Sequence, residues 1–489
     1  MIRSRRSVPA LRAALVLLAA AASFPVTAQE TLDRTKVPEP GPQPVLRVPT
    51  WTRSPLGSGA ELIVSEKDDL PLVSFTISFL GGADQFEPAD RRGVGSLTAA
   101  MLSEGTTTKT GEELSNALQL LGTSVSTRVG AETASIGFIS TSGKFGATLD
   151  ILADMLLHST FPADALERLR GQRLVALAQA KAQPGAIAAR VFPRVLYGPA
   201  HPFGQPVTET STKAITRDDV VSFHQRFFKP GRALVTVVGA VKPAEVKAAI
   251  DRALEAWARG GEKPAFSYPP VPPQQATTIY VVDRPGAAQA TFAIGAPGPP
   301  RTTPDYYALE VMNTILGGQF QSRLNANIRE EKGYSYGVRS GFAFGKGPGP
   351  FRTGGDVVGD KTDAALVEFM NELRGIQGTR PITDEELATA KSAIIQGLPS
   401  MFESVNGINA AISDLWLDGL PDDYYQQYGK AIDAVTKDDV VRVAKRYIPL
   451  DQLAVVIVGD RTAIEKPLEG TKIAPIVLLD ADGTRVDGK

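Results

Sequence analysis

An internal duplication constrains the fold of this 489-residue chain more than any other feature. Residues 214–239 read AITRDDVVSFHQRFFKPGRALVTVVG, and residues 434–459 read AVTKDDVVRVAKRYIPLDQLAVVIVG. The two segments align without a gap at a constant offset of 220 residues, and ten of their positions are identical. Matches of this quality rarely arise by chance, so the chain is expected to consist of two homologous halves.

Each copy predicts a capped helix followed by a strand. Thr216 and Thr436 supply N-cap oxygens, and Asp218 and Asp438 place negative charge in the first helical turn. Other segments with helical or alternating apolar patterns are expected to be strands (72–79, 234–238, 277–282, 290–294, 453–458) and helices (164–183, 304–328, 384–397). This mixture predicts an α+β fold in which each half is a mostly antiparallel sheet covered by helices.

Proline clusters divide the chain. Residues 29–52 are proline-rich and are expected to form an extended lead-in, and the cluster YPPVPP lies within a predicted linker at residues 266–275. The two predicted domains are therefore residues 53–265 and residues 276–489.

The first 28 residues predict a secretory signal peptide. They combine several arginines, an apolar run at residues 13–22 and the small cleavage-site segment Val-Thr-Ala at residues 26–28. A retained membrane anchor is the alternative, but the apolar run is short for a bilayer span. The mature protein is expected to be exported, to the periplasm, without a later membrane span; Sec and twin-arginine export remain open.

Composition excludes several classes of chemistry. The net charge of −1, from 52 basic and 53 acidic residues, argues against a nucleic-acid partner. The absence of cysteine excludes disulfides, thiolate metal sites and cysteine nucleophiles. The three histidines, His158, His201 and His224, are too far apart for a compact ligand motif and are expected to be structural or solvated. The chain also has no Gly-x-Ser-x-Gly nucleophile motif.

Three segments besides the duplication carry a family resemblance: RGVGSLTAAMLSEGT at residues 92–106, LYGPAHP at 196–202 and SRLNANIREEKGYSY at 322–336. With them the chain resembles the pitrilysin/insulinase-like zinc metallopeptidases, the family of the mitochondrial processing peptidase, over nearly all of its expected mature length. Active members carry His-x-x-Glu-His on a helix of the first half, with two metal-binding histidines and a glutamate that activates water.

The resemblance places that motif on residues that have lost its chemistry. Ser96 stands at the first histidine, Ala99 at the general base and Ala100 at the second histidine. The family's third ligand is a glutamate on the helix before the Leu-Tyr-Gly loop, whereas residues 168–208 contain no Asp or Glu. No metal ligand and no cofactor are therefore assigned to this chain.

The second half keeps a pair that the resemblance associates with catalysis. Arg329 and Tyr336 match an arginine and a tyrosine that, in active enzymes, reach from the non-metal half toward the scissile carbonyl. A guanidinium and a phenol can both donate hydrogen bonds to a developing oxyanion. The structural alternative is that Arg329 pairs with Glu330 while Tyr336 packs in the sheet. A glycine pair, Gly317-Gly318, resembles the family's turn before this segment.

Three functions follow as alternatives. In the first, the chain is the non-catalytic subunit of a heterodimeric zinc peptidase whose partner supplies His-x-x-Glu-His and zinc, so peptide hydrolysis requires that partner. In the second, the chain is an inert peptide-binding or scaffold protein of the same fold. In the third, it is a self-sufficient enzyme with an unrecognised site. The intact Arg329/Tyr336 pair favours the first, because a scaffold does not need an oxyanion-stabilising pair.

Overall fold

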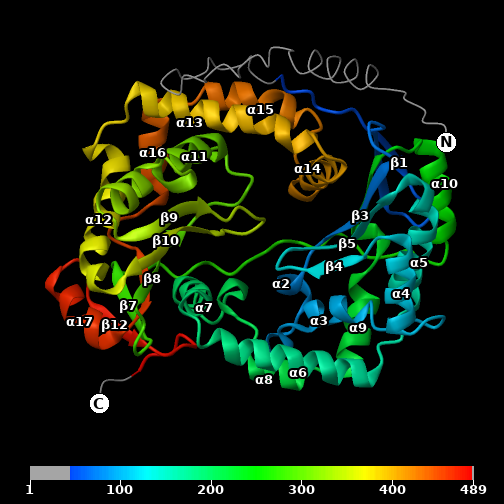
Figure 1. Cartoon of the computed structure of the whole chain (residues 1–489), viewed down its shortest axis with the longest axis horizontal. Helices are drawn as coiled ribbons and strands as arrows, with labels where there is room; N and C mark the ends of the chain where they lie inside the picture. Colours follow the sequence, from blue (N-terminus) through cyan, green and yellow to red (C-terminus); the bar gives the residue numbers. More distant parts are fainter. Residues whose placement is uncertain (1–44, 487–489) are drawn as a thin grey trace, which may run out of the picture. The chain divides into compact units, whose positions relative to one another are not determined.

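The computed structural model describes residues 45–486 (Figure 1). The predicted signal peptide and residues 29–44 of the predicted lead-in lie outside the described residues. Residues 45–51 have irregular backbone. No helix within the described range is both long and apolar enough to cross a bilayer.

Two six-stranded sheets organise the described chain, in agreement with the α+β fold of two homologous halves. The first sheet contains β1 (Thr52–Pro55), β2 (Glu61–Glu66), β3 (Leu72–Leu80), β4 (Ser126–Val129), β5 (Thr133–Thr141) and β6 (Ala233–Gly239). The second contains β7 (Thr278–Asp283), β8 (Gln289–Pro297), β9 (Ser335–Phe342), β10 (Pro350–Val358), β11 (Ala454–Gly459) and β12 (Ile476–Leu479).

Helices fill the connections between these strands. Those of the first half are α2 (Ala83–Phe86), α3 (Val94–Met101), α4 (Gly111–Leu121), α5 (Phe145–His158), α6 (Ala163–Ala180), α7 (Pro184–Tyr197), α8 (Glu209–Ala214), α9 (Arg217–Phe227) and α10 (Pro243–Ala253). Those of the second half are α11 (Tyr306–Asn313), α12 (Thr362–Arg374), α13 (Asp384–Gly397), α14 (Val405–Asp418), α15 (Tyr424–Asp433), α16 (Lys437–Tyr447) and α17 (Arg461–Gly470).

The sheets share one topology. Their strand orders are β1-β2-β6-β3-β5-β4 and β12-β7-β11-β8-β10-β9, so β2, β6, β3, β5 and β4 correspond to β7, β11, β8, β10 and β9. The pairs β2–β6 and β7–β11 are parallel, and the equivalent remaining pairs are antiparallel. The outer strands differ, because β1 is antiparallel to β2 and β12 is parallel to β7.

The predicted helix–strand repeat is α9 with β6 and α16 with β11. The five predicted strands are present as β3, β6, β7, β8 and β11, with ends shifted by three residues or fewer. Thr216 and Thr436 cap their helices as expected. The carboxylates that complete the two capping boxes are Asp219 and Asp439, the third residues of the first turns, rather than their neighbours.

Strand alternation gives each sheet a core face and an inner face. In β3, Val73, Phe75, Ile77 and Phe79 are fully buried in the first-half core, which also contains residues of α3, α5 and α9. The serines and threonine between them point to the opposite side, here called the inner face. The inner face of the first sheet is therefore rich in hydroxyl groups.

The halves exchange one helix. α14 of the second half lies against β3 and β6 of the first sheet, while α7 of the first half lies against β8 and β11 of the second sheet (Figure 1). α7 brings apolar residues such as Val191 and Phe192 onto Ala293 and Val456. α14 adds hydrogen bonds to an apolar contact that includes Leu234 and Val238 of β6: Asn409 Nδ2 donates to the carbonyl oxygens of Ser74 (3.2 Å) and Thr236 (3.0 Å).

A second contact between the halves lies at the tip of the β9–β10 hairpin. The backbone N–H groups of Lys346 and Gly347 each donate to the Glu132 carboxylate at 2.8 Å, and the hydroxyl of Tyr268 donates to the same group. Glu132 lies in the β4–β5 turn, and Tyr268 lies in the predicted linker, which has no helix or strand. One carboxylate thus joins both halves and the segment that connects them.

Candidate functional site

Helix α3 presents two positions four residues apart on one half-exposed face. Glu87 caps the first turn of this helix, because its carboxylate accepts hydrogen bonds from the N–H groups of Gly93 (2.8 Å) and Gly95 (2.7 Å). Leu97 and Met101 are buried beneath the helix, whereas Ser96 and Ala100 are partly open. Residues at i and i+4 share a helical face, so these two positions have the placement that a pair of metal-binding side chains needs.

An arginine from a second helix occupies the space beside Ser96. Arg173 of α6 donates from Nη2 to Ser96 Oγ (3.0 Å) and from Nη1 to the Gly93 carbonyl oxygen (2.7 Å). Burial lowers the pKa of Arg173 below its usual value and the charge of Glu87 opposes this shift, while the group remains a cation at any physiological pH. A positive charge therefore stands next to the predicted metal-ligand position.

These residues do not fit the zinc ion of active relatives. A serine hydroxyl and two methyl groups are not the imidazole, thiolate and carboxylate donors that zinc selects, and a guanidinium repels a divalent cation. Within residues 45–486, no group of three or more His, Asp or Glu side chains is arranged to hold a metal ion.

The three histidines have local structural partners. His158 Nδ1 lies 3.0 Å from Asp154 Oδ1, and His224 Nε2 lies 2.8 Å from the Leu156 carbonyl oxygen. His201 is 1% exposed, accepts from the Phe203 N–H and stacks on aromatic rings that include Tyr268. Burial lowers the pKa values of His201 and His224, so both favour the neutral form.

Strand β4 lies beside α3 at the edge of the first sheet. Thr127 of β4 donates from Oγ1 to the Ala99 carbonyl oxygen (2.7 Å), which joins the strand to the helix. β5 pairs with one side of β4, and no described strand pairs with the other. An edge strand offers unpaired backbone groups to an extended peptide.

The segment before Arg329 departs from the predicted single helix over residues 304–328. α11 ends at Asn313, a π-helical turn covers Thr314–Gly318, and a second π-helical segment covers Asn325–Glu331 after a break. Gly317 in the first π-helical turn lies directly against β9, because a Cβ there would lie 2.5 Å from Ser340 Oγ and 2.6 Å from Ser340 N. The glycine allows the chain to pass directly against β9.

Arg329 and Tyr336 have different surroundings. Arg329 Nη1 lies 3.2 Å from Glu330 Oε1, and its guanidinium carbon lies 4.3 Å from the centre of the Phe320 ring. This ion pair was one half of the structural alternative. The other half is wrong, because Tyr336 does not pack in the sheet: its side chain is 91% exposed.

A β-bulge explains this exposure. Val357 of β10 is in register with Ser335 and Gly355 is in register with Val338, so two residues of β9 face one of β10. Ser335 and Val338 are buried, and the two residues between them, Tyr336 and Gly337, are exposed. Ser335 Oγ donates to the Asp356 carbonyl oxygen (2.6 Å) and accepts from the Gly337 N–H (3.0 Å). Bulges of this kind redirect side chains, and this one turns Tyr336 toward solvent.

Sequence reasoning missed Arg173 and the bulge. The carboxylate-free stretch at residues 168–208 contains Arg173, but nothing in the local sequence indicates that its guanidinium reaches Ser96. The bulge left no recognisable signal, because SYGVRSGF reads as an ordinary alternating strand.

The duplicated α+β fold and the α3–α6 site define a class of proteins built like two-domain metallopeptidases. Comparison with known proteins agrees: residues 63–198 match the model described as insulinase (peptidase family M16), and residues 214–394 match the model described as peptidase M16 inactive domain. The chain belongs to peptidase family M16.

Its relatives support this assignment. An uncharacterized zinc protease of Bacillus subtilis, YmxG, is 23% identical over 360 residues, which cover 71% of this chain and 84% of that protein. An uncharacterized zinc protease of Mycobacterium leprae is 25% identical over 336 residues, covering 67% and 74%.

Solved structures share the fold. The peptidase M16 inactive domain of Pseudomonas fluorescens has a TM-score of 0.76 and 25% identity, and the match covers 84% of this chain and 98% of that one. A protease of Helicobacter pylori has a TM-score of 0.76 at 18% identity, with coverage of 84% and 99%. A chain of Complex III2 from Candida albicans has a TM-score of 0.69 at 15% identity, with coverage of 87% and 99%.

Proposed function

We propose that this protein is the non-catalytic subunit of a heteromeric M16 peptidase. A homologous partner chain would bring the His-x-x-Glu-His helix and its zinc, and this chain would bring Arg329, Tyr336 and half of the peptide-binding chamber. The observation that carries the proposal is the bulge in β9, which holds the phenol of Tyr336 outside the sheet. An exposed phenol on an ordered strand is available to a substrate bound by another chain.

In this proposal Arg329 and Tyr336 act as hydrogen-bond donors. In peptide hydrolysis the carbonyl oxygen gains negative charge as the tetrahedral intermediate forms, and donors aimed at that oxygen lower the barrier. Tyr336 would donate its hydroxyl and Arg329 its guanidinium. The ion pair of Arg329 with Glu330 is partly exposed, and exposed pairs contribute about 0–1 kcal/mol, so releasing the guanidinium toward a substrate costs little.

The peptide itself would bind in extended form. The edge strand β4 beside α3 supplies free backbone groups for such a ligand. The predicted leader suits a subunit that works outside the cytoplasm, and we propose a periplasmic location.

A scaffold or peptide-binding protein without any catalytic part is the second candidate. The Arg329–Glu330 pair favours it, because the guanidinium already has a partner within its own chain. The structural likeness to a chain of Complex III2 is compatible with that reading, at the level of fold.

The test measures turnover of the two-chain complex. The tagged protein is expressed in its native host, the co-purifying chain with His-x-x-Glu-His is identified, and the complex is reconstituted with wild-type, Tyr336→Phe or Arg329→Ala protein. Each substitution is expected to lower kcat by about 10- to 1000-fold, because it removes a donor to developing charge. Gel filtration should show unchanged association.

Tyr334→Phe is the matched control, because Tyr334 lies two residues earlier and packs partly against the second-half core. It should leave kcat within about twofold. Full hydrolysis by both the Tyr336→Phe and Arg329→Ala complexes would make the pair structural and favour the scaffold. Failure to recover any His-x-x-Glu-His chain would also contradict the proposed subunit.

A further inference from the structure

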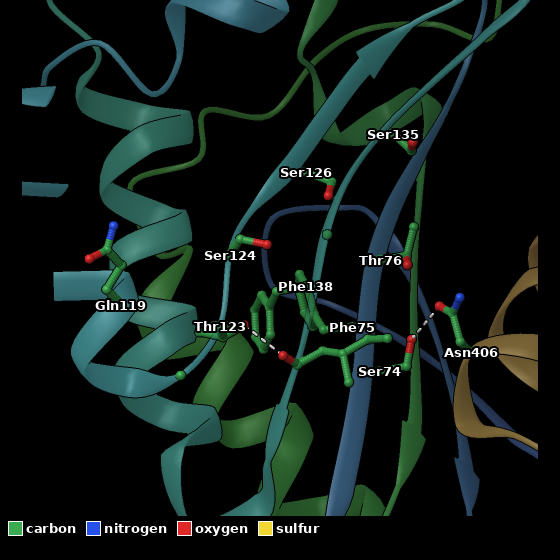
Figure 2. A pocket seen from close by; sticks show the side chains of 13 residues that line it. Ser74, Phe75, Thr76, Gln119, Thr123, Ser124, Ser126, Ser135, Phe138 and Asn406 are labelled. Carbon is green, nitrogen blue, oxygen red and sulfur yellow. Dashed lines mark hydrogen bonds between the residues drawn. The ribbon is translucent and has the colours of Figure 1, made fainter. Parts of the chain in front are cut away.

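The exchanged helices create two equivalent pockets, one on the inner face of each sheet. The first, of about 890 Å³, lies between α14 and the strands β3, β4 and β5 (Figure 2). Figure 2 shows hydroxyl side chains of Ser124, Ser126 and Ser135 around this pocket, with Asn406 of α14 close to Ser74. None of the residues that line it is charged.

The second pocket, of about 690 Å³, lies between α7 and the strands β8, β9 and β10. Its position is equivalent because α7 covers β8 as α14 covers β3. Its chemistry is different: the lining includes Arg339 of β9, Arg352 of β10 and Asp356 of β10.

The strand register shows which residues make the two pockets chemically different. Ser135 of β5 faces Ser78 of β3, and at the equivalent place Arg352 of β10 faces Gly295 of β8. Ser126 of β4 faces Gly137, and at the equivalent place Arg339 of β9 faces Gly354. Two serines of the first pocket are thus replaced by two arginines in the second. Both arginines lie on one face of adjacent strands at diagonal positions, within reach of one ligand group.

Arg352 has open space on one side only. It is in register with Gly341, where a Cβ would meet no atom within 4 Å, and with Gly295, where a Cβ would lie 3.0 Å from the Phe192 ring. The ring of Phe192 from α7 lies 5.8 Å from its guanidinium carbon. Burial lowers the pKa of Arg352, which nevertheless stays charged.

Neither arginine is neutralised within its own chain. Among residues 45–486, no carboxylate forms an ion pair with Arg339 or Arg352, and neither guanidinium donates a hydrogen bond to a protein acceptor. The nearby Asp356 is held by the Thr291 hydroxyl. Arg339 is exposed and Arg352 is half-buried, and no nitrogen of either guanidinium is a buried atom without a partner, so water reaches their donors and a ligand carboxylate would replace that water.

We propose that this second pocket, the arginine pocket, binds a carboxylate of an extended peptide, either its C-terminus or an Asp or Glu side chain. The proposal deepens the proposed function and rests on its peptide-binding part. A planar carboxylate matches the guanidinium fork of Arg352, and Arg339 adds a second positive charge from the adjacent strand. The first pocket, lined by neutral hydroxyl and amide groups, does not select for charge. The two pockets would therefore orient a peptide across the molecule.

The experiment uses the purified protein and four fluorescein-labelled ten-residue peptides of otherwise identical, neutral sequence. They carry Glu or Gln at one central position and a free or amidated C-terminus, so the two sources of carboxylate are separated. Fluorescence anisotropy at low salt measures Kd for the wild type and for Arg352→Gln, Arg339→Gln and Arg374→Gln. Arg374 is an exposed arginine at the end of α12 and serves as the charge-matched control.

The wild type and Arg374→Gln should bind at least one carboxylate peptide about tenfold or more tighter than the peptide with neither carboxylate. Arg352→Gln should abolish this preference, and Arg339→Gln should reduce it. Phenylglyoxal labelling of the wild type, read by mass spectrometry, should show Arg352 protected by the preferred peptide and Arg374 not protected.

Equal binding of all four peptides by the wild type would overturn the arginine pocket and leave peptide binding itself intact. Absence of binding by any peptide would overturn it as well, as would labelling of Arg352 that the preferred peptide does not slow. These outcomes are independent of the Tyr336 hydrolysis test, because they use this chain without its partner.

Discussion

The guanidinium of Arg173 and the hydroxyl of Ser96 are joined by a 3.0 Å hydrogen bond between α6 and α3. In the family pattern, Ser96 stands where an active enzyme has its first zinc-binding histidine. The bond ties α6 to α3, the helix on which active enzymes carry the family motif, and it does so with a positive charge. The absence of metal ligands and the presence of this cation therefore both disfavour zinc binding.

The isolated protein is expected to bind no stoichiometric zinc. The α3 positions offer no strong donor, and Arg173 adds repulsion. Elemental analysis of protein purified without chelators checks this directly. About one tightly held zinc per chain would show that the site has been wrongly assigned.

Restoring the family motif alone should fail for an electrostatic reason. Two unit charges 4 Å apart interact by about 4 kcal/mol near a protein surface, and zinc carries two. We expect the triple variant Ser96→His, Ala99→Glu, Ala100→His to bind zinc weakly and to hydrolyse no peptide. A fourth substitution, Arg173→Glu, should raise zinc affinity by at least 100-fold, because it exchanges a repelling cation for a third ligand.

The matched control for this experiment adds Arg168→Glu to the triple variant instead. Arg168 is on the same helix but pairs with Glu104 at an exposed position. Zinc affinity is measured by competition with a chromogenic chelator. Equal affinities of the Arg173→Glu and Arg168→Glu variants would mean that Arg173 does not control the site.

The exchanged helix α14 should depend on Asn409. This side chain is 2% exposed and donates to two backbone carbonyls of the first sheet. Asn409→Ala is expected to lower the free energy of unfolding by about 1–3 kcal/mol, the cost of leaving buried polar groups unpaired. Urea unfolding measures the change.

Asn406→Ala is the control for that measurement, since Asn406 lies one turn earlier on the same helix, is exposed and accepts only one long hydrogen bond, from Ser74 Oγ at 3.4 Å. It should change stability by less than about 0.5 kcal/mol. A similar loss in both variants would mean that the loss does not come from the two carbonyl contacts of Asn409, because Asn→Ala by itself favours the helix.

Glu386 should make stability depend on pH at the acidic end. The side-chain hydrogen bond from Arg323 lowers the pKa of Glu386 from 4.5 to about 2, aided by the Thr383 N–H. In the unfolded chain the group takes up its proton near pH 4.5, so the native state gains less from this carboxylate as pH falls from about 5 to 2. The contribution at pH 7 is at most about 3 kcal/mol.

The comparison is between wild type and Glu386→Gln, which keeps a capping acceptor for the Thr383 N–H. Their difference in unfolding free energy should be largest at pH 7 and should shrink steadily below pH 5. A difference that stays constant between pH 7 and pH 3 would contradict the ionic role of Glu386.

Local sequence patterns were sufficient for much of the fold. The Thr-x-x-Asp caps and the strands next to them are determined by neighbouring residues. Because the copies lie 220 residues apart, the same local pattern predicts the same elements in both halves. The alternation of apolar residues in β3 likewise predicted a strand with one buried face. The helix expected over residues 384–397 is α13 at the same bounds, and in the structure Thr383 caps it.

Local patterns did not predict the structure where contacts with a segment distant in the sequence determine it. The helix expected over residues 304–328 is interrupted after Gly318, in a segment where Gly317 lies directly against Ser340 of β9. The bulge that exposes Tyr336 depends on the register of β9 with β10, and register is a property of two strands.

The sequence by itself determined the duplicated α+β fold, its family and the missing donors at Ser96, Ala99 and Ala100, because these follow from local periodicity and residue identity. Only the tertiary structure decided that α7 and α14 cross to the opposite sheets, that Arg173 occupies the place beside Ser96, and that Arg339 and Arg352 share one pocket. Each of these is a contact between residues far apart in the chain. Their distance and orientation arise from packing, which no single segment encodes.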